Sequence, residues 1–261
     1  MTWDPKQYLR FVDERSRPFF ELVGRILTDR DDEIRSVVDL GCGPGNLTST
    51  LAQRWPGAQV LGVDNDAAML SSAAATASST VRYEHGGIAA WKPVRPVDVL
   101  VSNAAYQWVL PHLELLPTLL EHVRPGGWFA FQVPGNLDDP HHQAIRELRS
   151  RTRWAAVDTL AALPARTHVS YPAATYLDVL APLCSNVDAW ETSYVHILQG
   201  QDPILEWVKG TGLRPVLSAL ATDDLRAEFC AELAPLLRAA YPSRSWGTPF
   251  PFKRVFVVAR C

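Results

Sequence analysis

Three closely spaced glycines, Gly41, Gly43 and Gly45, follow the acidic residue Asp39 within the stretch VVDLGCGPGNLTSTL. An apolar run precedes them and a helical pattern follows, so the turn stands where a strand passes into a helix. Glycine at such a turn permits positive φ and lets a ligand approach bare backbone, and the next helix offers unpaired N–H groups at its start. The turn is therefore a candidate ligand site.

The spacing of these residues distinguishes two classes of ligand. A dinucleotide-binding turn reads G-x-G-x-x-G, with a pyrophosphate on the helix N-terminus, whereas this chain reads G-x-G-x-G. Asp39 ahead of the turn suits an ammonium group rather than a phosphate. Asp64 ends a second apolar run, 19 residues after Gly45, where a carboxylate can accept from both hydroxyls of a ribose. An ammonium site beside a ribose site favours S-adenosylmethionine over NAD.

Composition excludes several other classes of protein. The chain has 261 residues, 47% of them hydrophobic, enough for one sizeable core. Its formal net charge is -3 and it has no run of five basic residues, so we expect neither nucleic acid nor a membrane as partner. The four cysteines lack CxxC spacing, and DDPHH at 138–142 fits a loop and a helix start, so we expect no metal. No secretory leader is evident, and we expect a cytoplasmic protein.

Apolar runs alternate with helical patterns, which is typical of βα units and a mostly parallel sheet. The expected strands cover 36–40, 59–64, 81–84, 97–103, 128–133, 187–195 and 252–260. The expected helices cover 47–55, 67–77, 113–122, closed by RPGG, and then 139–153, 171–180, 204–209 and 222–241. We predict one α/β domain, 1–261, with a Rossmann-like, mostly parallel seven-stranded sheet, helices on both faces and a helical lid from 1–30, 135–182 and 202–246.

Several motifs carry a resemblance to known families. DLGCGPGN, the later VD, SNAAYQW and RPGGWFAF resemble class I S-adenosylmethionine-dependent methyltransferases. WDPKQYLRFVDERSRP, FQVPGNLDDPHHQAIREL, EWVKGTGLRP and FKRVFVVAR extend the resemblance, nearly end to end, to the trans-aconitate 2-methyltransferase family. The resemblance implies methylation of one carboxylate of a small tricarboxylic acid, with S-adenosylhomocysteine as second product. Amino methyltransferases that act on nucleic acid or glutamine resemble one another in an Asn/Asp-Pro-Pro-aromatic turn where this chain reads NAAYQW, so an exocyclic amine is not the expected acceptor.

A carboxylate acceptor needs no general base, because it is already ionised at neutral pH. The expected task of the protein is to position it, with arginines holding the remaining charges of a polycarboxylic acid. We expect Gln107 and Trp108 to do the positioning, with no catalytic base. The expected cofactor-binding residues are Asp39, Gly41, Cys42, Gly43, Gly45, Asn46, Asp64, Asn65, Met69, Gly87, Ile88, Asn103 and Ala104. The expected substrate-binding residues are Tyr8, Arg15, Arg17, Gln107, Trp108, Tyr171, Trp207, Arg214 and Arg254.

One position departs from the resemblance. Where the family has an acidic residue beside the adenine, this chain has Gly87 in the segment EHGGI, and glycine offers no side-chain acceptor. We therefore expect weakened cofactor binding. Three alternatives stay open: a methyltransferase of the same fold for another carboxylate, such as a malonyl group on a carrier protein; a catalytically silent S-adenosylmethionine-binding protein; and an NAD oxidoreductase. The expected lid is large enough to enclose a small ligand in a monomer.

Overall fold

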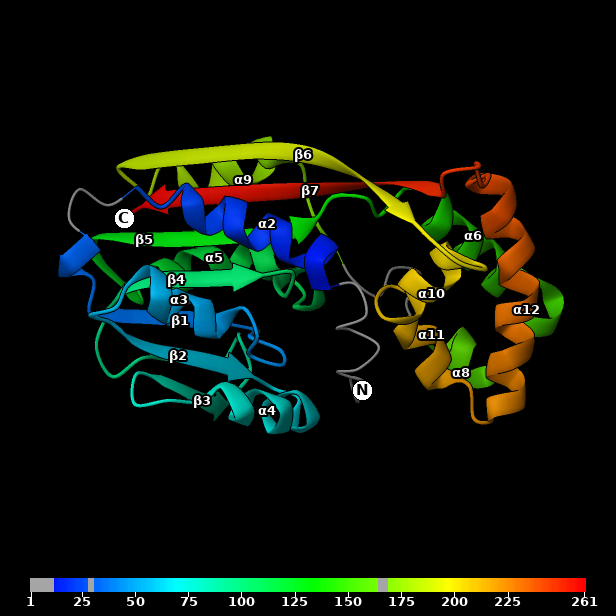
Figure 1. Cartoon of the computed structure of the whole chain (residues 1–261), viewed down its shortest axis with the longest axis horizontal. Coiled ribbons are helices and arrows are strands. Elements are labelled where there is room, and N and C mark those ends of the chain that lie inside the picture. The colour runs from blue at the N-terminus through cyan, green and yellow to red at the C-terminus, as the bar shows by residue number, and fades with distance from the viewer. Residues whose placement is uncertain (1–11, 28–30, 164–168) are drawn as a thin grey trace.

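The computed structural model describes residues 12–27, 31–163 and 169–261, with side chains from 16 and 32 onward in the first two ranges. These residues form one seven-stranded sheet in the order β3-β2-β1-β4-β5-β7-β6 (Figure 1). The strands are β1 (Ser36–Leu40), β2 (Gln59–Asp64), β3 (Val81–His85), β4 (Val97–Asn103), β5 (Val123–Pro134), β6 (Asn186–Leu198) and β7 (Thr248–Arg260).

Helices precede, connect and follow these strands. The α-helices are α2 (Val12–Gly24), α3 (Thr48–Arg54), α4 (Ala67–Ala73), α5 (His112–Leu120), α6 (Pro140–Ser150), α7 (Thr152–Ala155), α8 (Asp158–Ala161), α9 (Ala173–Leu180), α10 (Pro203–Lys209), α11 (Arg214–Ala219) and α12 (Asp223–Ala240). Short 3-10 turns are η1 (Asp31–Glu33), η2 (Ala74–Thr76) and η3 (Tyr106–Trp108).

The sheet confirms the predicted fold class. Strands β1 to β5 pair in parallel, and β7 runs antiparallel between β5 and β6. The chain builds outward from β1 through β2 to β3, and then returns to add β4 on the other side. Open α/β sheets bind ligands at such a reversal, beyond the carboxyl ends of the strands. The topology therefore directs attention to the turns that follow β1, β2 and β4.

Helices cover both faces of the sheet and make it the middle of three layers (Figure 1). On one face α2 and α3 pack through Phe19, Leu22 and Leu51, all fully buried, against β1, β4 and β5. On the other face α5 and α9 pack through Leu116 and Tyr176. Burying a large apolar side chain stabilises the fold by about 1.5–3 kcal/mol. These two layers therefore supply much of the stability of the frame around the β-strand ends.

The helices expected as a lid divide between two places. Within the expected lid segment 135–182, α9 packs on β6 and β7 as part of a sheet layer, which corrects that boundary. The described part of the expected N-terminal lid, α2, also lies on the sheet, over β5 and β7. By contrast α6, α7, α8, α10, α11 and α12 gather around their own core, which includes Trp154, Trp207 and Phe229. We call these six helices the helical unit; it lies beyond the strand ends in Figure 1.

Strands β6 and β7 are longer than the sequence pattern predicts, because they pair with each other along their whole length, from Asn186↔Arg260 to Leu198↔Thr248. Their outer halves form a two-stranded ribbon that leads to the helical unit (Figure 1). The carbonyl of Lys253 accepts from the N–H of Gly135, so the backbone polar groups of Lys253 face the β5 side of the strand. Backbone groups alternate in direction along a strand, so those of Pro251 and Pro249, two and four residues earlier, face the β5 side as well. There β5 has ended, and the missing N–H groups of proline cost no strand pairing.

The RPGG segment was expected to close a helix over 113–122, and the structure corrects this. Helix α5 ends at Leu120, and β5 already begins at Val123, which pairs with Val97. The register then shifts before Trp128 pairs with Val99, and Gly126 in between has φ +76°. Glycine tolerates that conformation, so the segment forms a bulge within the strand.

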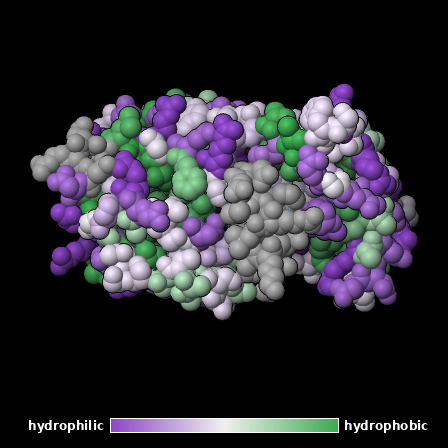
Figure 2. All heavy atoms as spheres, viewed as in Figure 1, coloured by the Kyte–Doolittle hydropathy of each residue, from purple (hydrophilic) through white to green (hydrophobic). Residues whose placement is uncertain are grey.

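The surface in Figure 2 is mostly polar, with hydrophobic residues in small separate groups. Within the described part of the chain, no helix combines the length and the apolar character needed to cross a membrane.

Asp98 joins three strands at the end of the sheet opposite to the turns that follow β1, β2 and β4. Its carboxylate accepts from the backbone N–H groups of Arg35 and Ser36 at 2.9 and 2.8 Å, from the Ser36 hydroxyl at 2.9 Å and from the Arg124 guanidinium. Burial raises the pKa of Asp98, but these hydrogen bonds outweigh burial and hold the pKa below its usual value. The ionised side chain therefore stabilises the start of β1 against β4 and β5.

Replacing Asp98 by asparagine should lower the free energy of unfolding by about 2–4 kcal/mol, because a buried charge partner is lost. Since the folded pKa is depressed, this stabilisation is complete above pH about 4 and is lost as pH falls through the folded pKa. Urea denaturation at pH 7 and pH 3 measures both effects. The matched control is Asp188→Asn, whose exposed ion pair with Arg25 spans 3.4 Å and should contribute less than about 1 kcal/mol. Equal losses in the two variants would contradict the assignment.

Candidate functional site

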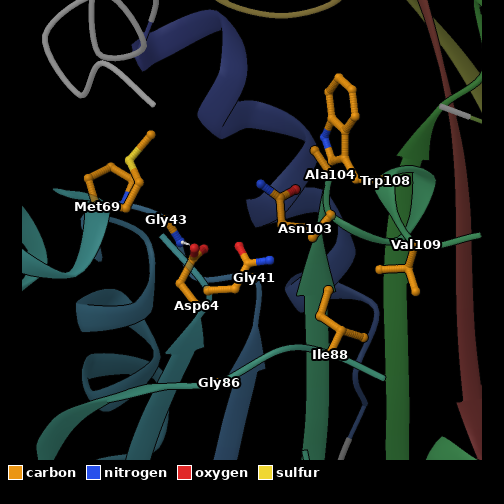
Figure 3. Close-up of a pocket in the computed structure, with 13 residues that line it drawn as sticks. Gly41, Gly43, Asp64, Met69, Gly86, Ile88, Asn103, Ala104, Trp108 and Val109 are labelled. Carbon is orange, nitrogen blue, oxygen red and sulfur yellow. Dashed lines mark hydrogen bonds between the residues drawn. The ribbon is translucent and has the colours of Figure 1, made fainter. Parts of the chain in front are cut away.

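A cavity of about 420 Å³ opens beyond the carboxyl ends of β1, β2 and β4 (Figure 3). This volume lies within the range of small-molecule sites. Its lining comes from the turn after each of these strands and from the segment after β3. The lining residues are Gly41, Gly43, Pro44, Asp64, Asn65, Met69, Gly86, Ile88, Asn103, Ala104, Ala105, Trp108 and Val109.

The glycine turn after β1 forms the floor of the cavity, and its glycines are required for two different reasons. The backbone N–H groups of Gly41 and Cys42 donate to the carbonyl of Val63, which fixes the turn on β2. At Gly41, with φ +80°, an added Cβ would lie 2.2 Å from the Cβ of Ala105. At Gly43, with φ +56°, an added Cβ would meet no atom within 4 Å. Gly41 therefore permits close packing, whereas Gly43 leaves open space where a ligand can approach the backbone.

Asp64, at the end of β2, points toward the adjacent turn at Gly43 (Figure 3). One carboxylate oxygen accepts from the N–H of Gly43 at 2.8 Å, and the other accepts from the N–H of Asp66 at 2.9 Å. Burial raises the pKa of Asp64, and these two hydrogen bonds partly oppose the rise. Each carboxylate oxygen has a second lone pair, so Asp64 can still accept hydrogen bonds from a ligand.

Asp39 lies beneath the glycine turn and is only 2% exposed. Its Oδ2 accepts from the Thr48 hydroxyl at 2.6 Å, while its buried Oδ1 has no hydrogen-bond partner among the described residues. Burial, joined by the charge of Asp64, raises the pKa of Asp39 to about 7. A buried acceptor without a partner is costly, so a positive group near the turn would stabilise the ionised acid.

The turn after β4 holds a strained residue. Ala104 has φ +53°, a left-handed conformation that costs a non-glycine residue about 1–2 kcal/mol. Its N–H donates to the carbonyl of Gln132 at 2.9 Å, and its carbonyl accepts from Gln107 Nε2 at 2.5 Å. Strain of this kind persists where the surroundings enforce it, commonly at functional sites. The two hydrogen bonds therefore hold Ala104 against the cavity.

The structure brings most of the expected cofactor-binding residues to one cavity. Eight line it: Gly41, Gly43, Asp64, Asn65, Met69, Ile88, Asn103 and Ala104. Five do not: Asp39 and Cys42 are buried behind the turn, Gly45 packs against Tyr83, and Asn46 and Gly87 lie outside the lining. Four lining residues were not expected, namely Pro44, Gly86, Ala105 and Val109. Each of the four is a direct neighbour in the sequence of an expected site residue. That adjacency was the signal in the sequence that could have placed them at the cavity.

The four arginines expected at the substrate do not converge on the cavity. Arg15 belongs to α2, and its side chain lies outside the described residues. Arg17 is exposed and pairs with Glu21 at 2.8 Å, because the opposite side of α2 packs on the sheet. Arg214 begins α11 within the helical unit, and Arg254 is buried in β7. None of the three described side chains lines the cavity, so the structure does not bring the expected arginines together there.

The expected aromatic wall is also smaller than predicted. Trp108 lines the cavity, and Tyr8 lies outside the described residues. Tyr171 packs in an aromatic cluster between α5 and α9. Trp207 is 1% exposed in the core of the helical unit, so its assignment to the substrate site is corrected. Gln107, 2% exposed, supports the turn at Ala104 and does not line the cavity.

The described residues contain no group of three or more His, Cys, Asp or Glu side chains arranged to hold a metal ion. His141 and His142 of the DDPHH segment lie in contact with each other in α6. His141 there hydrogen-bonds to the Tyr241 hydroxyl at 2.8 Å. This segment therefore has a packing role between α6 and the end of α12.

Asp39→Asn should stabilise the ligand-free protein above neutral pH. Since the folded pKa of about 7 exceeds the unfolded value of 3.8, stability falls as pH rises between these values and is then constant. Asparagine does not titrate, so the variant should gain about 1–4 kcal/mol over wild type by pH 8 and little at pH 4. Chemical denaturation from pH 4 to 8 measures the difference. A difference independent of pH would contradict burial of an ionisable Asp39.

Comparison with known proteins agrees with this geometry. Residues 8–181 match a family model described as a methyltransferase domain. The chain is 48% identical to a trans-aconitate 2-methyltransferase of Streptomyces avermitilis, over 99% of this chain and 96% of that protein. It is also 48% identical to a protein of the same name from Mycolicibacterium gilvum, over 99% and 98% of the two chains.

Solved structures show the same fold at low sequence identity. Coclaurine N-methyltransferase, bound to N-methylheliamine and S-adenosylhomocysteine, has a TM-score of 0.56 and 15% identity, covering 95% of this chain and 73% of that one. Phosphoethanolamine N-methyltransferase 2 of Haemonchus contortus, with S-adenosyl-L-methionine, has a TM-score of 0.56 and 14% identity, covering 94% and 52%. Family model, relatives and fold agree, and the chain belongs to the S-adenosylmethionine-dependent methyltransferases, among the relatives named trans-aconitate 2-methyltransferase.

Proposed function

We propose that this protein transfers the methyl group of S-adenosylmethionine to one carboxylate of trans-aconitate, giving a monomethyl ester and S-adenosylhomocysteine. One observation carries the proposal: the partly buried Asp64 lines the cavity and accepts from the N–H of Gly43, and the buried Asp39 lies beneath the same glycine turn, at the reversal of the sheet. The substrate follows from relatives of that name at 48% identity over nearly the whole chain.

The residues present fit the cofactor. S-adenosylmethionine carries a positive ammonium group, a positive sulfonium and a ribose with two adjacent hydroxyls. Asp64 has free lone pairs for the hydroxyls, and the partnerless Oδ1 of Asp39 makes the floor of the cavity favourable for positive charge. Gly86 and Ile88, from the segment after β3, would border the adenine. When bound, the cofactor supplies a methyl group on sulfur that is open to attack by a nucleophile.

The protein's contribution is to position the acceptor. Of the described residues that line the cavity, Asp64 alone has a side chain that titrates, and its hydrogen bonds hold it at the glycine turn. An acceptor that is already ionised suits a site with no general base. Trp108 and Val109 provide apolar surface that excludes water at the side of the cavity facing Asn103 (Figure 3). Orientation in a dry site strengthens attack by a carboxylate.

We further propose that the protein acts as a monomer in the cytoplasm. The four cysteines are free thiols, as expected in a reducing compartment. Light scattering during gel filtration would measure the mass directly.

Transfer of radiolabelled methyl should discriminate among the acceptors. The panel contains trans-aconitate, cis-aconitate, citrate, isocitrate and a malonyl-carrier protein, and products are identified by mass. We expect label on trans-aconitate, as a monomethyl ester. Label on the malonyl-carrier alone would assign another carboxylate. No label on any member, with cofactor binding shown by calorimetry, would favour a silent binding protein.

Gly87→Asp should tighten cofactor binding. An added Cβ at Gly87 would meet no atom within 4 Å, so a side chain can be accommodated beside the expected adenine site. A new hydrogen bond to the adenine amine is worth about 0.5–1.5 kcal/mol, or roughly 2- to 10-fold in the dissociation constant. Calorimetry with S-adenosylhomocysteine measures it. Gly87→Ala fills the same space without an acceptor and should give no gain; equal effects of the two variants would contradict the adenine contact.

A further inference from the structure

Three polar side chains on neighbouring strands form a continuous hydrogen-bonded row that ends at the cavity. Arg254 Nη1, on β7, donates to Gln132 Oε1, on β5, at 3.4 Å. Gln132 Nε2 in turn donates to Asn103 Oδ1, on β4. Asn103 and Gln132 are register partners, so their side chains lie on the same face of the sheet. Gln132 and Arg254 are 1% and 6% exposed, whereas Asn103 lines the cavity.

The direction of hydrogen bonding along this row is fixed from its buried end. A guanidinium has only donors, so the amide oxygen of Gln132 must face Arg254 and its amide nitrogen must face Asn103. That nitrogen is a donor, which requires the oxygen of Asn103 opposite it. The Asn103 amide nitrogen is thereby left for the cavity. Figure 3 shows it on the side of Gly43, with the oxygen toward Trp108.

The row also gives the cavity two sides of different chemistry. Asp39 and Asp64 place two carboxyl groups on the side of β1 and β2, where a positive group of a ligand would favour their ionised forms. On the side of β4, Asn103 offers N–H groups, and the buried guanidinium of Arg254 lies behind it, linked through Gln132. N–H donors that point into the cavity favour a carboxylate oxygen.

We propose that Gln132 and Arg254 are positioning residues: they hold the Asn103 amide so that its N–H groups bind a carboxylate in the cavity. This inference rests on the proposed function, which supplies two carboxylates, one on the acid substrate and one on the methionine part of the cofactor. We call this hydrogen-bonded row from Arg254 through Gln132 to Asn103 the relay. Neither Gln132 nor the relay was expected from the sequence. Arg254, expected to bind substrate directly, acts in this arrangement through two intervening amides.

The test is to reverse the polarity of the row with Gln132→Glu. A carboxylate at 132 accepts from Arg254 and also from the Asn103 amide nitrogen, so Asn103 turns and presents its oxygen to the cavity. Carboxylate binding should then weaken by roughly 10- to 100-fold, with a smaller change in kcat. The matched variant Gln132→Met removes the relay without reversing it, and binding should weaken less.

Stability separates this role from a purely structural one. Gln132→Glu places an anion beside the buried guanidinium, whereas Gln132→Met removes a hydrogen-bond partner, so the glutamate variant should have the higher Tm. The order of binding should be the opposite, with the methionine variant binding more tightly. If Gln132 had a purely structural role, the variant with the higher Tm would also bind the carboxylate more tightly. That result would overturn the proposal.

Two binding measurements identify the source of the carboxylate. Calorimetry with S-adenosylmethionine reports the methionine carboxylate, and the KM for trans-aconitate at saturating cofactor reports the acid substrate. Weakening in either measurement supports the relay and names its ligand. Less than about 2-fold change in both, in a folded Gln132→Glu protein, would overturn it.

A readout independent of turnover keeps the relay distinct from the proposed function. The side-chain amide signals of Asn103, assigned by their loss in Asn103→Asp, are followed by NMR as S-adenosylhomocysteine and then trans-aconitate are added. In wild type they should shift on addition of the ligand whose carboxylate is bound, and in Gln132→Glu they should not. If wild type fails to methylate trans-aconitate, the proposed function fails, while these shifts and the cofactor calorimetry still decide the relay. Absence of any shift in wild type would overturn it.

Discussion

The placement of two carboxylates, one buried and one partly buried, beside a bare backbone turn is the constraint on which the rest of this structure depends. Parallel pairing of β1 with β2 sets Asp39 opposite Gly62 and brings Asp64 beside the turn after β1. Burial raises the pKa of both acids, so the ligand-free site stores unfavourable electrostatic energy. The left-handed glycines, the Thr48 hydroxyl and the Asp98 hydrogen bonds hold the strands in the arrangement that maintains it. A cationic ligand relieves the strain that these contacts preserve.

Much of the sheet could be predicted from the sequence, because its central strands are short apolar runs buried on both faces. The bounds expected for β1, β2 and β4 agree with the structure. The prediction failed where pairing, rather than local pattern, decides the length of a strand. The outer halves of β6 and β7 contain prolines and polar residues, and only their pairing with each other makes them strands. In the same way RPGG reads locally as a helix stop, yet Val123 before it already pairs with Val97.

The candidate site shows the same division. Residues that belong to a turn with a characteristic spacing, such as Gly41, Gly43 and Asp64, could be placed at the cavity from the sequence. Residues chosen by type alone could not, because a guanidinium or an indole is equally suited to a surface or a core. Trp207 fills the core of the helical unit, and Arg17 pairs with Glu21. The relay through Gln132 depends on the register of β4 on β5, which no local pattern reveals.

The prolines of the β6–β7 ribbon have a further consequence. A two-stranded ribbon that leaves its sheet has an open edge, and such edges recruit strands from other molecules. Pro249 and Pro251 remove two donors from the side of β7 that β5 no longer covers, so that side cannot complete a regular ladder with an incoming chain. The β7 edge of the ribbon can thus extend beyond the sheet toward the helical unit without becoming a template for aggregation.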